Sequence, residues 1–164
     1  MIDKNDLVKW LQKVDKNIKK HILVVAVGGT AMTLLGLKSS TVDVDFCVNS
    51  KDKEELEAAI SGTFKVDIFV DGYIFSEQLP DDYMSKAKEI IEMKNITLKA
   101  LSPTDIIITK AARLNARDEE DIEALAKHVD KEILVKRFKI VVKTYAGSEK
   151  QYNENFNHIL KRFF

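Results

Sequence analysis

Several features are scarce in this 164-residue sequence, and each scarcity excludes a class of structure or function. The single cysteine, Cys47, has no partner for an internal disulfide, and no apolar run reaches the roughly eighteen residues that a membrane span requires. We therefore expect a cytoplasmic protein without membrane contact. Lys and Arg number 26 and are balanced by 26 Asp and Glu, so the chain as a whole is no polycation for nucleic acid.

Motifs for several other chemistries are also missing. The three histidines, His21, His128 and His158, have no partner at a recognisable metal or catalytic-triad spacing. The glycine pair Gly28-Gly29 lacks the third glycine of a dinucleotide-binding fingerprint. No long linker, repeat or low-complexity run divides the chain. With 45% hydrophobic and 32% charged residues, the composition is that of an ordinary globular protein.

The stretch from Val24 to Phe46 carries most of the information about function. Residues 21–27 are rich in β-branched types and predict a strand that leads into Gly28-Gly29-Thr30. Since glycine has no Cβ, backbone N–H groups can approach a phosphate closely at this pair. The helix expected around residues 31–35 offers its positive N-terminal end to the same anion. A glycine pair taken alone is more often just a turn. In this context, between a strand and a helix, the pair indicates a phosphate site.

Asp43 and Asp45 lie in the next expected strand, over residues 41–46. Side chains alternate across a strand, so both carboxylates face one side, about 6–7 Å apart, while Val42, Val44 and Phe46 point into a core. Two carboxylates this close repel each other, and a divalent metal bound by oxygen ligands would relieve that cost. The alternative interpretation is the polar face of a half-exposed strand.

At these residues the chain resembles the DNA polymerase β-like nucleotidyltransferase superfamily. Its signature is matched here by Val27-Gly28-Gly29, thirteen intervening residues and Asp43-Val44-Asp45-Phe46. The family also needs a third carboxylate between apolar residues on a neighbouring strand, and Val66-Asp67-Ile68 fits. Asp71 competes for that role on the same strand face. Because aspartate before glycine is a common turn pair, Asp71 is assigned to a turn with Gly72 and Asp67 to the site.

The resemblance implies an α/β fold, in which a small twisted mixed β-sheet is built around the Asp43 and Asp67 strands and flanked by helices. Residues 1–101 would form the nucleotidyltransferase core, and residues 102–164 a C-terminal helical segment packed on it. Hydrophobic spacing predicts an amphipathic helix in the first twenty residues and a charged helix over 51–60. The remaining expected elements of the core are a helical turn over 82–86 and strands over 65–70, 73–79, 89–93 and 96–101.

Ser102-Pro103-Thr104-Asp105 predicts the start of a helix, with Ser102 as its cap. We expect Lys110, Arg113 and Arg117 to form one cationic stripe on this segment, away from the buried side. That buried side is expected to comprise Ile106, Ile107, Ala111 and Leu114. Further helices are predicted over 118–128, 131–145 and 149–164.

The run from Ser102 to Asp121 is similar to a second conserved block in the abortive-infection-type branch of the superfamily. There a helical lysine contacts the nucleotide phosphates, and an Asp-x-x-Asp pair follows. Lys110 matches the lysine, and Asp118 and Asp121 match the pair in spacing. Acidic residues in a first turn also favour the helix dipole, so these two aspartates are not included in the predicted site.

The resemblance implies a metal-dependent nucleotidyltransferase, which moves a nucleoside monophosphate from a nucleoside triphosphate to an acceptor hydroxyl and releases pyrophosphate. Two Mg²⁺ ions, with Mn²⁺ as an alternative, would be the cofactors. Asp43, Asp45 and Asp67 would be the catalytic and metal-binding residues. The nucleotide would be bound by Gly28, Gly29, Thr30 and Lys110.

The acceptor and the partners stay open at this stage. Relatives in the superfamily modify tRNA, proteins or small hydroxylated molecules, and some act in toxin–antitoxin pairs. From Lys127 onward, nine Lys and Arg stand against four acids, and Tyr152, Phe156 and Phe163 recur at helical spacing. These C-terminal helices are the candidate surface for self-association or for a toxin or antitoxin partner. The alternative function is a non-catalytic, antitoxin-like or regulatory binding module that retains the fold.

Overall fold

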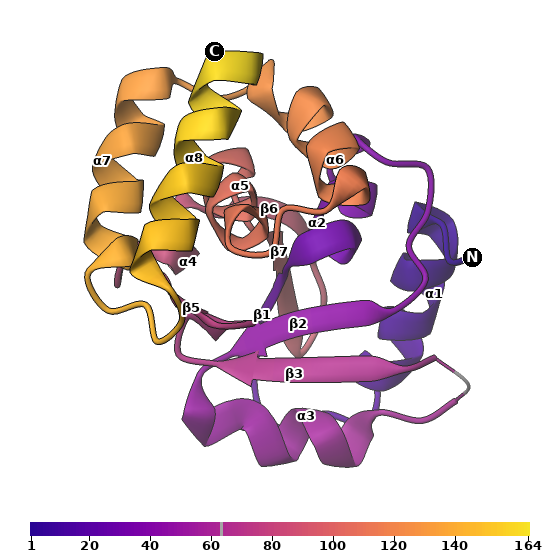
Figure 1. The fold of residues 1–164 in the computed structure, drawn as a ribbon. Helices are drawn as coiled ribbons and strands as arrows, with labels where there is room; N and C mark the ends of the chain where they lie inside the picture. Colours follow the sequence, from indigo (N-terminus) through magenta and orange to yellow (C-terminus); the bar gives the residue numbers. More distant parts are fainter. Residues whose placement is uncertain (63) are drawn as a thin grey trace. The chain divides into compact units, whose positions relative to one another are not determined.

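The computed structural model describes residues 1–62 and 64–164, which fold into two compact units. The first unit comprises residues 1–71 and 84–101, and the second comprises residues 72–83 and 102–164. Figure 1 shows the elements of both along the chain. One helical turn, α4 (Tyr83–Lys86), lies where the chain returns from the second unit to the first.

The first unit is built on a mixed β-sheet, as the predicted fold class requires. Its strands follow the order β3-β2-β1-β7-β6. The β1–β7 and β2–β3 pairs are parallel, whereas β1–β2 and β6–β7 are antiparallel. The strands are β1 (Ile22–Ala26), β2 (Val44–Val48), β3 (Val66–Val70), β6 (Lys88–Glu92) and β7 (Ile96–Ala100).

The helices of the first unit are α1 (Lys4–Asp15), α2 (Gly28–Leu34), the 3-10 turn η1 (Ser50–Asp52) and α3 (Lys53–Ala59). The predicted amphipathic pattern of α1 is confirmed, because Leu7, Leu11 and Val14 are buried. Each such side chain stabilises the fold by about 1.5–3 kcal/mol. Helix α2 begins at Gly28, three residues before the predicted start.

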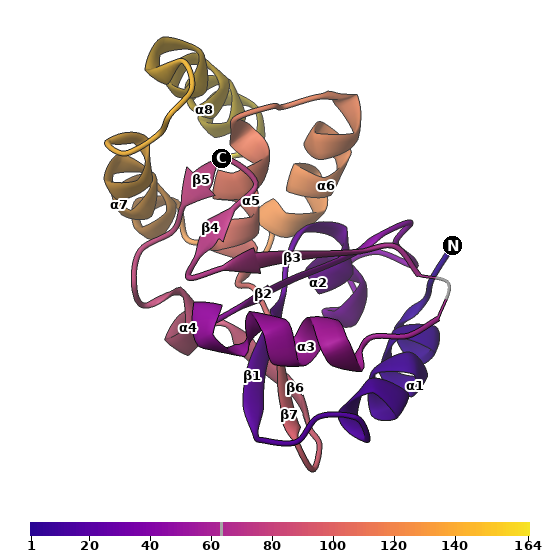
Figure 2. The same ribbon diagram turned by 90° about the horizontal axis from the view of Figure 1, so that it is seen from below.

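Helices α1 and α3 lie on the same face of the sheet. The Trp10 ring of α1 stacks on Phe46 of β2, with centroids 6.2 Å apart. The Trp10 indole N–H donates to the Ser61 carbonyl just after α3. Figures 1 and 2 both show α3 beside β3. Since neighbouring side chains on a strand point to opposite faces, Asp45 faces away from α1.

Val42 does not lie in the core, contrary to the prediction. Val42 is 66% exposed, whereas Val44 and Phe46 are fully buried. The strand β2 begins only at Val44, and residues 42 and 43 form a bend, so the alternation that buries Val44 and Phe46 does not extend to Val42. The segment that contains Asp43 and Asp45, called the aspartate segment below, therefore enters the sheet from a bend.

The second unit contains a short hairpin and the four helices α5 (Pro103–Ala111), α6 (Ala116–Ala126), α7 (Lys131–Val142) and α8 (Glu149–Phe163). The start of α5 is as predicted, because the Ser102 hydroxyl accepts from the Asp105 N–H. The single strand predicted over 73–79 is wrong. It is two short strands, β4 (Tyr73–Ile74) and β5 (Glu77–Gln78), which pair antiparallel across a turn where Phe75 has a positive φ of 56°.

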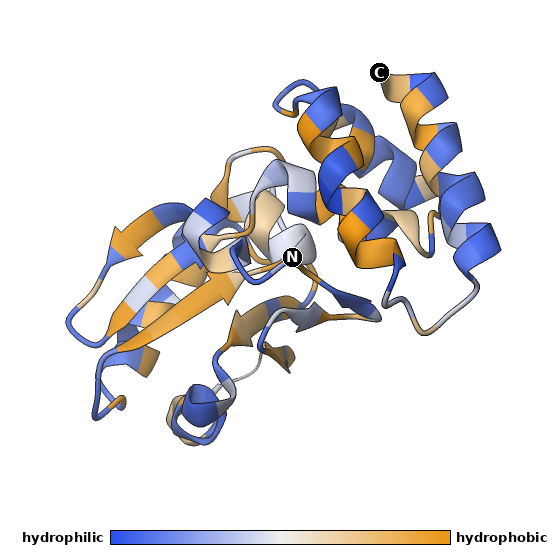
Figure 3. Ribbon diagram, turned by 90° about the vertical axis from the view of Figure 1, so that its left-hand side faces the viewer, coloured by the Kyte–Doolittle hydropathy of each residue, from blue (hydrophilic) through white to orange (hydrophobic). Residues whose placement is uncertain are grey.

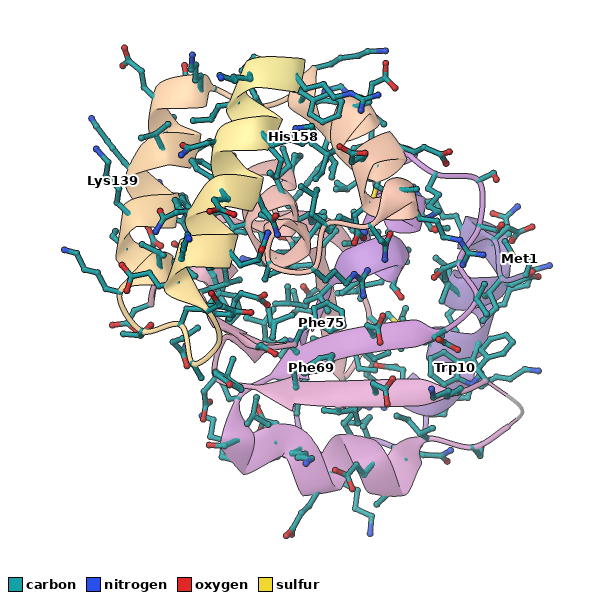
Figure 4. All side chains as sticks on the ribbon, in the orientation of Figure 1. Met1, Trp10, Phe69, Phe75, Lys139 and His158 are labelled. Atoms are coloured by element: carbon teal, nitrogen blue, oxygen red, sulfur yellow. The ribbon has the colours of Figure 1, made fainter. Side chains whose placement is uncertain are left out.

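Aromatic side chains form the core between α7 and α8. Phe138 stacks on Phe156 with centroids 3.8 Å apart, and the buried Tyr152 hydroxyl donates to the Ile108 carbonyl. Figure 3 shows hydrophilic and hydrophobic residues alternating along the helices of this unit, and Lys139 points outward from α7 in Figure 4. Helices of the described residues are all too short or too polar to span a bilayer.

Candidate active site

Asp45 and Asp67 lie side by side on the parallel strands β2 and β3. Their Cα atoms are direct partners in the register of this pair. Neighbouring strands are about 4.8 Å apart, and side chains at partnered positions point to the same face. Asp67 is exposed and Asp45 is partly exposed, so both carboxylates are accessible from that face. Like charges placed opposite each other destabilise a sheet. This pair of carboxylates therefore lowers the stability of the fold, which indicates a functional role.

Asp43 lies in the bend that leads into β2 and is held through its carbonyl. The Thr41 hydroxyl donates to the Asp43 carbonyl at 2.9 Å, and the Thr30 hydroxyl donates to the same oxygen at 3.2 Å. Thr30 also accepts from the Asp45 N–H at 3.0 Å. The buried Thr30 on α2 therefore fixes the backbone on both sides of Val44. Thr41 was not predicted from the sequence, because its contact depends on the bend.

The glycine pair forms the first turn of α2, directly after β1. Gly28 has a positive φ of 54°, a conformation that side chains other than glycine rarely adopt. A Cβ at Gly29 would lie 3.1 Å from the Thr41 Oγ1 atom. The N-cap residue of this helix, Val27, makes no side-chain capping hydrogen bond. Backbone N–H groups of the first turn are thus positioned beside the aspartate segment by a conformation that requires glycine.

The donor set at this face consists of carboxylate oxygens, which suit a hard divalent cation. Within residues 1–62 and 64–164, no group of three or more His, Cys, Asp or Glu side chains is gathered closely enough to hold a metal ion. Mg²⁺ is usually bound through one or two carboxylates and the phosphates of its substrate, without an all-protein cage. A paired Asp45 and Asp67 fit that mode of binding.

Asp71 lies in a turn, as predicted. Its backbone has a positive φ of 53° next to Gly72, and its carboxylate accepts from the Ser50 N–H at 2.9 Å. Asp67 lies within β3, whereas Asp71 directly follows the strand. Cys47 follows Asp45 on β2 and is buried.

Lys110 is buried in the second unit, so the predicted cationic stripe is wrong at this residue. Only 5% of Lys110 is exposed, and its ammonium nitrogen lies 2.9 Å from Asp121 and 3.3 Å from Asp118. Asp118 also accepts two hydrogen bonds from the Arg113 guanidinium. Arg117 is exposed. The predicted contact between Lys110 and a nucleotide stays a prediction, while its contacts with the two aspartates are structural.

Opposing effects act on the pKa of Asp118. Burial alone would raise the pKa, but the hydrogen bonds from Arg113 and from the Asn115 N–H, together with the charge of Lys110, hold it below the usual aspartate value. Asp118 is therefore ionised at neutral pH and neutralises the cations on either side. The sequence spacing identified this pair of aspartates, but not Lys110 as their partner.

Comparison with known proteins gives a family and a fold. The family model described as "Nucleotidyltransferase of unknown function (DUF6036)" matches residues 5–163. No curated protein matches the chain. The chain is similar in fold to the crystal structure of ANT(2″)-Ia in complex with adenylyl-2″-tobramycin, with a TM-score of 0.55 and 11% identity, over 92% of this chain and 98% of that one.

A solution structure of the same antibiotic-resistance factor, ANT(2″)-Ia, is similar to the same degree. Its TM-score is 0.57 at 11% identity, and the match covers 96% of this chain and 99% of that one. At this identity the likeness concerns the fold alone. The mixed sheet and its helices therefore have a counterpart among solved structures.

Proposed function

We propose that this chain, which belongs to the nucleotidyltransferase family DUF6036, transfers a nucleoside monophosphate from a nucleoside triphosphate to an acceptor hydroxyl and releases pyrophosphate. The observation that carries this proposal is the register that pairs Asp45 with Asp67 on two parallel strands. The Gly28-Gly29 turn and Asp45 belong to one strand–helix–strand segment, β1–α2–β2, so the proposed phosphate site and one carboxylate of the pair come from the same segment.

The proposed roles follow from the positions of the residues. The N–H groups at Gly28, Gly29 and Thr30 would bind the leaving phosphates. Asp43 and Asp45 would hold a divalent ion on the triphosphate side, and Asp67 would complete a second ion's site beside the acceptor hydroxyl. Mg²⁺, when bound there, would neutralise the phosphate charge and make the attacking hydroxyl more acidic.

The bond changes of the proposed reaction are simple. The acceptor oxygen forms a bond to the α-phosphorus, and the bond from that phosphorus to the β-phosphate oxygen breaks. Thr30 contributes by fixing the backbone of Asp43 and Asp45 through its hydroxyl. A displacement of these carboxylates by about 1 Å costs roughly a hundredfold in rate, so this support is part of the proposed site.

Titration calorimetry with a non-hydrolysable triphosphate tests the carboxylate site without knowledge of the acceptor. We expect Asp45→Asn to weaken binding in Mg²⁺ by about tenfold or more, because one charged ligand is lost, and to leave the fold intact. Asp71→Asn is the matched control, since that carboxylate lies in a turn of the same unit. Equal affinity in Mg²⁺ and in chelator would overturn the metal-dependent proposal and favour a binding module.

The acceptor is proposed only as a class that carries a free hydroxyl group. ANT(2″)-Ia, which is similar in fold, is described in complex with adenylyl-2″-tobramycin, so aminoglycosides belong among the candidate acceptors to be tried. Total RNA and a protein fraction form the other two arms. Mass spectrometry of each arm after incubation would identify an acceptor by the mass of one added nucleoside monophosphate.

A further inference from the structure

The second unit contains a small pocket of about 140 Å³. Its lining comes from the turn between β4 and β5, from α5 and the residues just after it, and from the segment between α7 and α8. The lining residues used below are Phe75, Ser76, Glu77, Thr109, Arg113 and Tyr145. An apolar cavity of about 150 Å³ holds a benzene molecule, so this pocket suits a fragment of one ring.

Glu77 is the unusual member of this lining. The residue is 1% exposed, and its Oε2 atom accepts a hydrogen bond from the Ser76 N–H at 3.1 Å. In the part of the chain that the structure describes, no lysine, arginine or histidine nitrogen is within salt-bridge distance of Glu77. A buried carboxylate is costly unless a cation or hydrogen bonds compensate its charge. Glu77 is therefore a buried carboxyl group that hydrogen bonds compensate and that has no cation among the described residues in salt-bridge contact.

The nearest cation is already engaged. Arg113 donates from Nε to Asp118 at 2.8 Å and from Nη2 to the same carboxylate at 2.9 Å. The other cation of this cluster, Lys110, contacts Asp118 and Asp121. Both cations are thus paired with other carboxylates, and neither forms a salt bridge with Glu77. A ligand that enters the pocket would be favoured if it carries a positive charge.

Aromatic rings complete the lining. The Arg113 guanidinium lies 5.7 Å from the centre of the Phe75 ring, and the Tyr145 ring lines the same pocket. Faces of aromatic rings attract cations and also provide apolar contact area. The Ser76 and Thr109 side chains add hydroxyl groups. The lining thus combines one carboxylate, two rings, small polar groups and the Arg113 guanidinium, which is paired with Asp118.

We propose that this pocket binds the protonated amino group of a small organic molecule, with Glu77 as its counter-ion and Phe75 and Tyr145 as its walls. The site lies wholly within the second unit and uses none of the three aspartates of the first unit. Its existence does not depend on the proposed transfer reaction.

The state of Glu77 gives the site a dependence on pH. Burial raises the pKa of Glu77 to about 7, while the Ser76 N–H and the charge of Arg113 act in the opposite direction. Burial and the charge of Glu77 raise the pKa of Tyr152, so this tyrosine stays neutral in this range. Below pH 7 the carboxyl is protonated and loses its charge, so the affinity for an ammonium group should fall as the pH is lowered.

The test is an amide-resonance titration of the full chain with benzylamine, which combines one ring with one ammonium group. We expect benzylamine to shift resonances of Ser76, Glu77 and Thr109 at pH 8, and to bind Glu77→Gln about tenfold to a hundredfold more weakly. Affinity should fall at pH 5.5 in the parent protein and not in the variant. Glu123→Gln, which removes an exposed carboxylate from α6 of the same unit, is the matched control and should bind as the parent does.

Uncharged and anionic analogues keep the test decisive even if Glu77→Gln does not fold. Benzyl alcohol and benzoate have the same ring, and both should bind the parent protein about tenfold more weakly than benzylamine does. Tighter binding of benzoate would mean that Arg113 determines the charge preference and would overturn the proposal. So would an unchanged benzylamine affinity in a folded Glu77→Gln variant, or shifts confined to residues outside this pocket.

Discussion

Gly28 and Gly29 are glycines for two different physical reasons. Gly28 has a positive φ of 54°, so any other residue there would be strained by its own backbone. Gly29 has no such constraint, but a Cβ at that position would lie 3.1 Å from the Thr41 Oγ1 atom. Because Thr41 also donates to the Asp43 carbonyl, a side chain at Gly29 would disturb the aspartate segment as well as cover the N–H groups of α2.

We predict that Gly29→Ala weakens binding of a triphosphate by about tenfold, the value of one charge-assisted hydrogen bond. Its free energy of unfolding should change by less than about 1 kcal/mol. The higher helix propensity of alanine, worth a similar amount, opposes the cost of the close contact with Thr41. Calorimetry and chemical unfolding of the same samples measure the two quantities.

Thr41→Ala separates the two ways in which Gly29→Ala could act. It removes the oxygen that the new Cβ would approach, so a double-mutant cycle isolates the contact between the two positions. If the double variant binds triphosphate as tightly as Thr41→Ala alone, the loss came from the contact with Thr41. The approach of phosphate to the Gly29 backbone would then have no part in binding.

At the scale of elements, α5 and α6 are joined by charges inside the second unit. Lys110 of α5 contacts Asp118 and Asp121 of α6, and Arg137 of α7 donates two hydrogen bonds to the buried Asp105 of α5. Removing one partner of a buried ion pair leaves an uncompensated charge, which typically costs about 3–5 kcal/mol. These pairs therefore fix how the helices of this unit pack against each other.

Lys110→Ala should lower the free energy of unfolding by about 3 kcal/mol, because Asp118 and Asp121 lose a shared cation. If Lys110 also contacts the β- and γ-phosphates, the variant should bind a triphosphate about tenfold to a hundredfold more weakly and a monophosphate equally well. Chemical unfolding measures the first effect, and calorimetry with the two nucleotides measures the second.

Arg117→Ala is the matched control, because this exposed residue follows Lys110 by seven positions and carries the same charge. It should alter neither stability nor nucleotide affinity at moderate salt. A destabilised Lys110→Ala protein that binds triphosphate with unchanged affinity would restrict Lys110 to its structural role.

For the molecule as a whole, local patterns predicted the elements well, and tertiary contacts explain the differences. The start of α5 depends on Ser102 and its neighbours alone, so it could be predicted. The burial of Lys110 depends on carboxylates eight and eleven residues later, which helical spacing within α5 does not reveal. The hairpin turn at Phe75 was missed because no glycine marks its positive φ.

The position of Asp45 could be predicted in part for a related reason. Alternation along the strand places Asp45 opposite the buried Val44 and Phe46, whereas Asp43 lies in the bend before β2, which this alternation does not describe. The register that sets Asp67 beside Asp45 required the resemblance to a family, since pairing between strands is not encoded in either strand alone. The charge of the Glu77 pocket could not be predicted, because its lining comes from three separate segments.

The central claim is that this chain moves a nucleoside monophosphate, and the fate of the α-phosphate tests it most directly. The protein is incubated with Mg²⁺, the acceptor arms described above and triphosphates labelled at either the α- or the γ-phosphate. We predict that the α-label joins an acceptor, that one pyrophosphate is released for each transfer, and that Asp45→Asn and chelator abolish both while Asp71→Asn does not. Transfer of the γ-label to an acceptor, or equal α-label transfer by Asp45→Asn, would contradict the account.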